Sequence, residues 1–169
     1  DKFGVPIGLA CELYQIAGTL PGIDVVGVDL HIGSQLIELS PFKAAFLRLA
    51  HLIKQLKALG HQIAQIDLGG GLGVCYQNES PPSADAYAEL VKETLGSFGC
   101  QMILEPGRAL VADSGVLLCK VIEVKGTLEQ RFMIVDAAMN DLLRPALYDA
   151  WHPINPVIQA GENSLSEVV

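Results

Sequence analysis

The sequence IAQIDLGGG (residues 63–71) joins a short apolar segment directly to three consecutive glycines. Ile63–Leu68 predicts a β-strand that ends abruptly at Gly69. Three glycines after a strand let the backbone approach a ligand closely and direct several N–H groups at an anion. A tight turn is the alternative, and it would be preferred for an isolated Gly-Gly pair. The run of three favours a phosphate site.

The spacing of the glycines narrows the kind of phosphate ligand. A dinucleotide-binding G-x-G-x-x-G pattern that starts at Gly69 or Gly71 would need its third glycine at Val74 or Tyr76. No G-K-[ST] sequence of a triphosphate-binding loop follows either. The pattern therefore favours a simpler phosphate ligand over a dinucleotide or a nucleoside triphosphate.

The flanking sequence alternates between strand and helix patterns. Val25–Ile32 and Met102–Leu104 predict two more strands. Ser40, as an N-cap before a proline, begins a predicted helix that Gly60 ends, and Ala84–Leu95 predicts a second helix. This repeated strand, loop and helix order predicts an α/β fold with parallel strands and helical crossovers.

Polar or glycine-rich sequence follows all three predicted strands, at the edge where α/β folds bind ligands. His31 ends the first strand, where a structural and a functional role are equally supported, and Ser34 adds a hydroxyl beside it. Glu105 would project from the end of a buried strand and need a cationic partner, such as a protonated heterocycle nitrogen. Arg108 can bind a phosphate or a carboxylate bidentately. A plain surface ion pair across a Pro-Gly turn is the alternative for Glu105 and Arg108.

The pattern changes near residue 112. Gly115–Lys125 and Gln130–Asp136 predict an antiparallel β domain, so the domain boundaries are placed at 1–112 and 113–169. Within the second segment, Arg144 and Tyr148 taken alone predict a turn with an exposed arginine and a packed tyrosine. Three histidines lie in no recognisable constellation and receive no role: His51, His61 and His152.

Composition excludes several classes of protein. The 11 Lys+Arg and 19 Asp+Glu residues give a formal net charge of −8, which argues against a nucleic-acid or anionic-membrane partner. The longest apolar runs are far shorter than a membrane-spanning helix. Four widely separated cysteines predict neither a disulfide framework nor a metal site, but buried thiols of a cytoplasmic protein. The length of 169 residues is below the roughly 250 of a complete (β/α)₈ barrel, so any barrel here is partial.

Five motifs in order resemble the diaminopimelate decarboxylases, which belong to the alanine-racemase-like (fold type III) pyridoxal-phosphate enzymes. The motifs are KFG (2–4), HIGSQ (31–35), DLGGGLG (67–73), EPGR (105–108) and VDAAMNDLLRPALYDAWHPI (135–154). The last one is specific to the diaminopimelate branch. The resemblance implies the central part of such an enzyme, with the C-terminal part of a (β/α)₈ TIM-type barrel in 1–112. The start of an antiparallel β domain would follow in 113–169. The implied activity is decarboxylation of meso-diaminopimelate to L-lysine, in lysine biosynthesis.

The resemblance also implies site residues around pyridoxal 5'-phosphate. Cofactor contacts are implied for His31, Ser34, Gly69, Gly70, Gly71, Glu105, Pro106, Gly107 and Arg108. His31 would stack on the pyridoxal ring and Glu105 would face the pyridine nitrogen, which makes these two the candidate catalytic residues. Substrate contacts are implied for Arg108, Arg144 and Tyr148, and no metal is implied.

The chain also departs from the family. None of its seven lysines stands in the context of the family's Schiff-base lysine, and the family's Cys-Glu-Ser-like motif and late active-site tyrosine are not found. Without the Schiff-base lysine, the chain alone is expected to be inactive. The family also builds each site across a homodimer. A related ornithine or arginine decarboxylase is an alternative, although Arg144 and Tyr148 disfavour a basic substrate side chain. A non-catalytic pyridoxal-phosphate-fold binding protein is the other alternative, suggested by the missing lysine.

Overall fold

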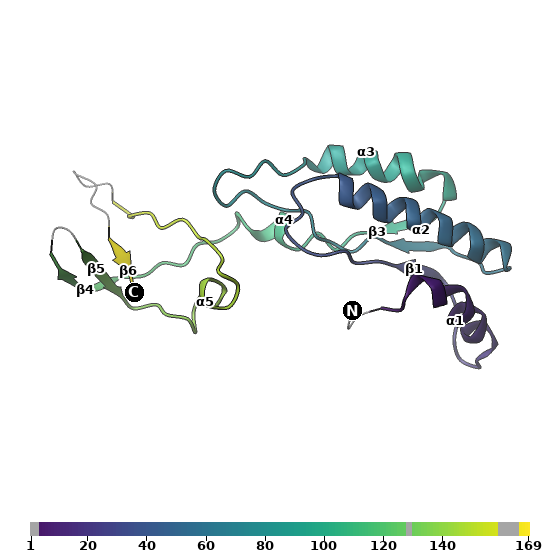
Figure 1. Cartoon of the computed structure of the whole chain (residues 1–169), viewed down its shortest axis with the longest axis horizontal. Coiled ribbons are helices and arrows are strands. Elements are labelled where there is room, and N and C mark those ends of the chain that lie inside the picture. Colours follow the sequence, from purple (N-terminus) through teal and green to yellow (C-terminus); the bar gives the residue numbers. More distant parts are fainter. Residues whose placement is uncertain (1–3, 128–129, 159–165) are drawn as a thin grey trace. The chain divides into compact units, whose positions relative to one another are not determined.

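The computed structural model describes residues 4–127, 130–158 and 166–169, which form two units (Figure 1). The first unit comprises the chain up to Cys75 and Glu79–Ala112. The second comprises Tyr76–Asn78 and Asp113–Val169. Each unit is described by itself below.

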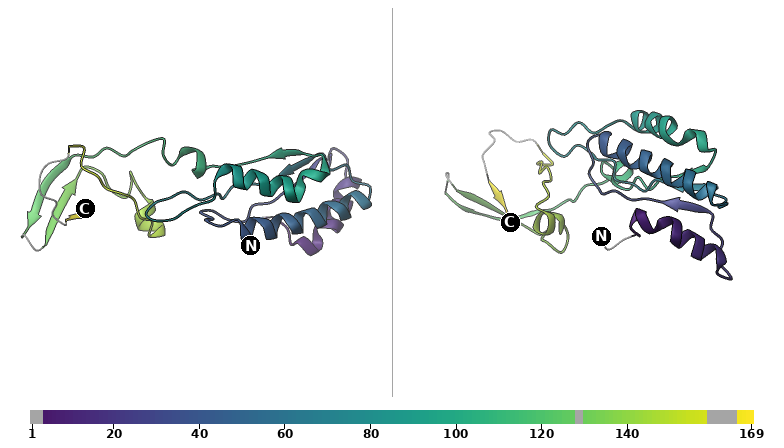
Figure 2. Two further views of the ribbon diagram at one scale, coloured as in Figure 1. Left: turned by 90° about the horizontal axis from the view of Figure 1, so that it is seen from above. Right: turned by 45° about the vertical axis from the view of Figure 1, so that its right-hand side comes forward.

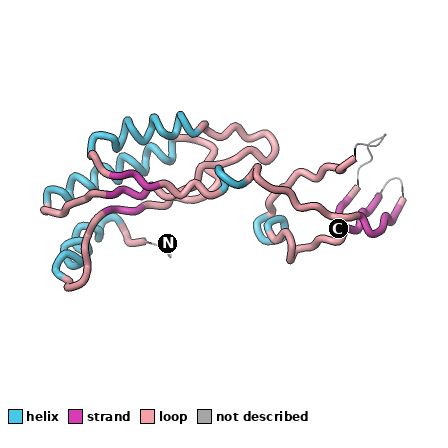
Figure 3. The backbone as a smooth tube through the Cα atoms, turned by 180° about the vertical axis from the view of Figure 1, so that it is seen from behind, coloured by secondary structure: helices cyan, strands magenta, loops and turns pink. Residues whose placement is uncertain are grey.

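The first unit is built on a parallel three-stranded sheet in the order β1-β2-β3. Its strands are β1 (Gly27–Asp29), β2 (Gln65–Asp67) and β3 (Gln101–Ile103), which Figure 3 shows side by side. The strands β1 and β2 are shorter than predicted, whereas β3 has the predicted length and begins one residue earlier. The chain turns soon after β2 because the Asp67 carboxylate accepts the Gly69 N–H at 2.9 Å. The predicted α/β class and the parallel strand pairing are confirmed.

Two long helices cover one face of this sheet (Figure 2). They are α2 (Ser40–Ala58) and α3 (Ala84–Leu95), and the bounds of α3 agree with the prediction. The Ser83 hydroxyl caps α3 by accepting the Ala86 N–H at 3.2 Å. The prediction of Ser40 as an N-cap is wrong, because Ser40 already lies within α2 and donates its hydroxyl to Glu38.

The central strand and the two helices make the core of the first unit. Ile66 of β2 is fully buried, and Val28 of β1 lies beside it in register. Seven large side chains of this core are almost inaccessible to solvent: Phe42, Phe46, Ile53, Leu56, Ile66, Leu68 and Leu95. The packing of α2 and α3 on the sheet therefore fixes the positions of the strands and of their carboxyl ends.

The helix α1 (Ile7–Thr19) is not predicted by the sequence pattern. Apolar residues surround most of its circumference and Gly8 lies in its first turn, so it shows no one-sided apolar stripe. Tertiary contact fixes it instead: the Tyr14 hydroxyl donates to the Gly27 carbonyl of β1 at 2.8 Å. The unit is completed by the short elements η1 (Gly96–Phe98) and α4 (Arg108–Val111).

The second unit contains a small sheet in the order β4-β5-β6. Its strands β4 (Val121–Gly126) and β5 (Arg131–Val135) form the antiparallel pair that the sequence predicts. The two-residue β6 (Glu167–Val168) adds in parallel to β5, so the sheet is mixed. The one helix in the described part of this unit is α5 (Arg144–Tyr148).

The cysteines differ from the prediction of buried thiols. All four are free, and Cys75 and Cys119 are exposed. Across residues 4–127, 130–158 and 166–169, no cluster of histidine, cysteine and acidic side chains could hold a metal ion. No helix in the same ranges combines the length and the apolar character needed to cross a membrane.

Candidate functional site

The three glycines after β2 are wedged between the loops that follow β1 and β3. A Cβ added to any of them would collide with a carbonyl oxygen of a neighbouring loop: Leu30 for Gly69, Glu105 for Gly70 and Gly33 for Gly71. Gly69 and Gly71 also have positive φ, at 60° and 106°. Glycine is therefore required here for close backbone approach as well as for conformation.

The backbone N–H groups of this glycine loop (Gly69–Gly71) differ in their hydrogen bonding. The Gly69 N–H donates to Asp67, and the Gly73 N–H donates to the Leu36 carbonyl at 3.0 Å. Within the described residues, the N–H groups of Gly70 and Gly71 reach no acceptor. Two adjacent backbone donors in a loop where a side chain has no room fit the phosphate of pyridoxal 5'-phosphate.

The loop after β1 lies against the glycine loop. The His31 imidazole is exposed, and its Nδ1 lies 3.0 Å from the position that a Cβ on Gly69 would take. Ser34 is exposed further along, and Leu36 and Leu72 form an isolated parallel bridge. The structure thus brings His31 together with the glycines, at the edge that the sequence indicates.

The loop after β3 lies on the other side of the glycine loop. The Glu105 N–H donates to the Gly69 carbonyl at 2.7 Å, while the Glu105 side chain is exposed. The strand before it is only half-buried, because β3 has a strand neighbour on one side of the described sheet. Gly107 has φ 45° and precedes α4, which begins at the half-buried Arg108.

A residue without an assigned role, Gln35, connects all three loops. Its side-chain oxygen accepts from the Val74 N–H at 3.2 Å and from Arg108 Nη1 at 3.0 Å. Its side-chain nitrogen donates to the Val74 carbonyl at 2.5 Å. Only its position in the HIGSQ motif next to Ser34 offered a signal, because its partners lie far away in sequence.

A second cluster, formed by Tyr76, Arg144 and His152, lies within the second unit. Arg144 Nη1 is 3.1 Å from the Tyr76 hydroxyl and 3.1 Å from His152 Nε2. Burial, and then the positive charge of Arg144, lower the pKa of His152, which keeps the imidazole neutral and able to accept from Arg144. His152, to which the sequence assigned no role, is thus a neighbour of a candidate substrate residue.

The exposures of Arg144 and Tyr148 are the reverse of what their local sequence predicts. Arg144 is half-buried among its two aromatic neighbours, and its guanidinium carbon lies 5.3 Å from the Tyr76 ring centroid. Tyr148 is 70% exposed at the end of α5. The prediction of an exposed arginine and a packed tyrosine is wrong, because Tyr76, 68 positions away, covers the arginine instead.

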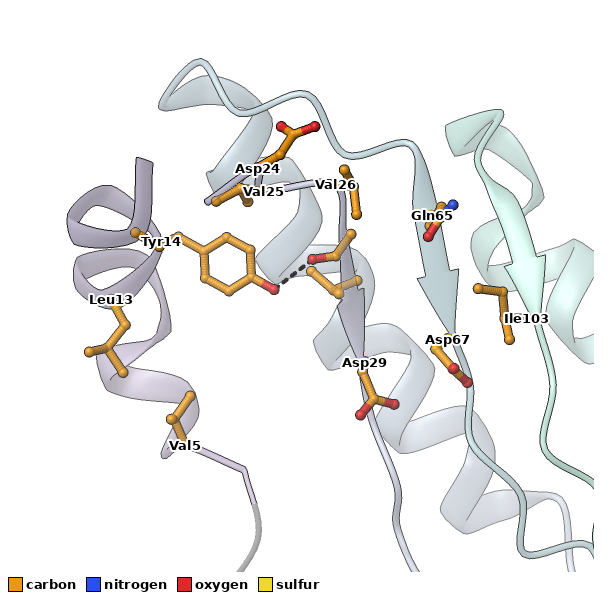
Figure 4. Close-up of a pocket in the computed structure, with 13 residues that line it drawn as sticks. Val5, Leu13, Tyr14, Asp24, Val25, Val26, Asp29, Gln65, Asp67 and Ile103 are labelled. Atoms are coloured by element: carbon orange, nitrogen blue, oxygen red, sulfur yellow. Dashed lines mark hydrogen bonds between the residues drawn. The ribbon is translucent and has the colours of Figure 1, made fainter. Parts of the chain in front are cut away.

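A pocket of about 530 Å³ lies between α1 and the sheet face opposite α2 and α3 (Figure 4). Leu13 and Tyr14 line it from α1, and Asp29 and Asp67 line it from the strands. None of the sequence-predicted site residues lines this pocket. The loops that follow β1, β2 and β3, called the strand-end loops below, are therefore separate from this pocket.

Comparisons with known proteins identify the family to which the chain belongs. The family described as "Pyridoxal-dependent decarboxylase, pyridoxal binding domain" matches residues 1–112. The chain is 49% identical over 158 residues to a diaminopimelate decarboxylase of Vibrio cholerae, covering 93% of this chain and 38% of that protein. It is 44% identical over 170 residues to that of Zymomonas mobilis, covering 99% of this chain and 40% of that protein.

A solved structure is similar over the whole chain. The crystal structure of diaminopimelate decarboxylase from Helicobacter pylori complexed with L-lysine superposes with a TM-score of 0.94 at 42% identity, covering 100% of this chain and 42% of that one. The chain spans about two fifths of the length of the curated relatives that it matches. Together with the match over residues 1–112, these similarities show that the chain belongs to the pyridoxal-dependent decarboxylases, with residues 1–112 matching their pyridoxal-binding domain.

Proposed function

We propose that the chain is part of a diaminopimelate decarboxylase, which removes CO₂ from meso-diaminopimelate to give L-lysine. The observation that carries the proposal is the glycine loop, wedged between two strand ends, with two backbone N–H groups that find no acceptor in the described part of the chain. The 44–49% identity to diaminopimelate decarboxylases supports the choice of substrate. Bound pyridoxal phosphate supplies an electron sink for the bond that breaks when CO₂ leaves.

The residues of the strand-end loops suit this cofactor. The Gly70 and Gly71 N–H groups would bind its phosphate, together with the Arg108 guanidinium, the Ser34 hydroxyl and the backbone at Pro106 and Gly107. His31, beside Gly69, would cover one face of the ring. Glu105 would hold a proton on the pyridine nitrogen, because a carboxylate favours the cationic form of a nearby base.

Cationic side chains suit a substrate with two carboxylates, of which one is lost. Arg108 and Arg144 would bind carboxylates of the amino acid through paired N–H donors, and Tyr148 would add a hydroxyl. The Tyr76 hydroxyl and the neutral His152 hold the Arg144 guanidinium in one orientation. Orienting the arginine before binding lowers the entropy lost when the substrate binds.

The wider architecture belongs to the same proposal. Residues 1–112 would form part of a (β/α)₈ barrel, since a parallel sheet is normally covered on both faces and its second face here lines an open pocket. Residues 113–169 would begin the β domain. The complete protein would be a cytoplasmic homodimer with shared active sites. Size-exclusion chromatography coupled to light scattering would test the dimeric state.

The activity is tested on the complete protein with pyridoxal phosphate. We expect release of CO₂ and formation of lysine from meso-diaminopimelate, and little turnover of ornithine. Arg144→Ala is expected to raise KM for diaminopimelate by about tenfold or more, since hydrogen bonds to charged groups contribute about 1.5–3 kcal/mol. Steady-state kinetics measure this change.

Arg48→Ala is the matched control, because Arg48 is an exposed arginine of α2. It should leave KM unchanged. Turnover of ornithine but not of diaminopimelate would refute the proposed substrate. An unchanged KM in Arg144→Ala would remove Arg144 from the substrate site.

Lysine labelling tests the chain of 169 residues alone. Six of its lysines lie outside the strand-end loops: Lys43, Lys54, Lys57, Lys92, Lys120 and Lys125. Lys2 lies outside the described residues. Borohydride reduction with pyridoxal phosphate, followed by peptide mapping, should therefore give weak labelling spread over several lysines. One strongly labelled lysine would overturn this placement and would indicate a cofactor-linking residue in the chain.

A further inference from the structure

Gln35 adopts a backbone conformation that glutamine rarely takes. Its φ is 60°, in the left-handed region, and it shares a positive φ with only one other non-glycine in the described residues, Asp149. Such a conformation persists only where surrounding contacts impose it. The Gln35 side chain makes three hydrogen bonds, and these bonds hold its backbone in the strained conformation.

The Gln35 amide pairs with the backbone of Val74 as another strand would. The side-chain oxygen accepts the Val74 N–H, and the side-chain nitrogen donates to the Val74 carbonyl. Val74 follows the glycine loop by three residues, while the Asp67 carboxylate holds the Gly69 N–H at the other end. The loop is therefore fixed at both ends by side-chain hydrogen bonds.

The same Gln35 oxygen also accepts from Arg108 Nη1 at 3.0 Å. An amide oxygen has two acceptor positions, so it can serve Val74 and Arg108 together. Arg108 is the single Lys or Arg in the three strand-end loops (residues 30–39, 68–83 and 104–108). A neutral amide orients this cation without cancelling its charge, which a carboxylate at the same place would do.

We propose that Gln35 is a positioning residue that holds the glycine loop and the Arg108 guanidinium in place for the phosphate of the cofactor. This inference rests on the proposed cofactor site and extends it to a side chain that need not touch the cofactor. In this proposal, Gln35 helps the protein to recognise the phosphate group of the cofactor and not its pyridine ring. Its removal should therefore weaken binding of phosphorylated ligands selectively.

The test compares the affinity of the complete protein for pyridoxal phosphate with its affinity for pyridoxal. Gln35→Gly removes the amide, and glycine adopts the left-handed backbone without strain, so the effect of the variant comes from the lost side-chain hydrogen bonds. We expect its Kd for pyridoxal phosphate to rise about tenfold, with little change for pyridoxal. Gln35→Glu keeps an acceptor for Arg108 but adds a negative charge, and it should lose at least as much affinity for pyridoxal phosphate.

Gln62→Glu is the matched control for charge, since Gln62 is exposed in the loop before β2. It should leave both affinities unchanged. If the Gln35 variants bind both ligands as the unaltered protein does, or lose both equally, the positioning role is wrong. If the unaltered protein does not prefer pyridoxal phosphate to pyridoxal, the proposed cofactor site itself is wrong, and this inference fails with it.

Discussion

Replacing Gly70 by alanine is expected to disrupt the candidate cofactor site and to destabilise the first unit. The new methyl group would overlap the Glu105 carbonyl oxygen and press on the carbonyl carbon behind it. Both are backbone atoms that the Glu105 N–H bond to Gly69 holds in place. Relief requires the strand ends to separate, and overpacking of this kind costs about 1–3 kcal/mol.

Two measurements check the Gly70→Ala prediction. Urea unfolding followed by far-UV circular dichroism should show a lower midpoint, because the long helices belong to the first unit. The affinity of the complete protein for pyridoxal phosphate should fall by more than tenfold, since the loop that carries the Gly70 and Gly71 N–H groups is displaced.

Gly8→Ala is the control for the Gly70 variant. Gly8 lies in α1 with open space where a Cβ would be placed. The same added methyl group should there be neutral, or stabilising by up to about 1 kcal/mol through helix propensity. Equal stability and equal cofactor affinity in Gly70→Ala and the unaltered protein would contradict the close packing of the strand ends.

The largest loss of stability is expected for Phe46→Ala. Phe46 of α2 is fully buried, and its ring meets Phe42 at 6.1 Å and Tyr87 of α3 at 5.9 Å between centroids. Removing it leaves a cavity between the helices and breaks these aromatic contacts, which costs about 3–5 kcal/mol. Because whole domains are stable by only about 5–15 kcal/mol, a large part of the stability would be lost.

Denaturant unfolding of the chain measures the effect of Phe46→Ala, with Leu47→Ala as the control. Leu47 is the next residue of α2 and is 54% exposed, so its truncation should change the free energy of unfolding by less than about 0.5 kcal/mol. Similar midpoints for the two variants would show that α2 does not pack on α3 through this face.

The two destabilising substitutions, Phe46→Ala and Gly70→Ala, affect different parts of the first unit. Phe46 contributes to the core that joins the helices, whereas Gly70 determines how closely the strand-end loops approach each other. We expect Phe46→Ala to weaken cofactor binding only through the fraction of unfolded protein. Gly70→Ala should weaken it even when the protein is folded, and comparing affinities at low temperature separates the two.

Much of the first unit could be predicted from local sequence. The α3 bounds follow from the Ser83 cap and the helical spacing, and three strand-and-loop units follow from apolar runs that end in glycine or turn residues. These signals act between residues a few positions apart. The lengths of β1 and β2 and the N-cap of α2 were not predicted correctly, because these ends depend on contacts with segments that lie far away in sequence.

The sequence by itself determined the α/β class and the resemblance to a pyridoxal-phosphate decarboxylase, and it predicted the glycine loop as an anion site. Only the tertiary structure decided that Gln35 joins three loops, that Arg144 is held by Tyr76 and His152, and that α1 lies on β1. Each of these contacts joins groups that no local pattern connects, such as Gln35 and Arg108, 73 positions apart. Hydrogen-bonding side chains reveal their partners only when packing brings distant segments within about 3 Å.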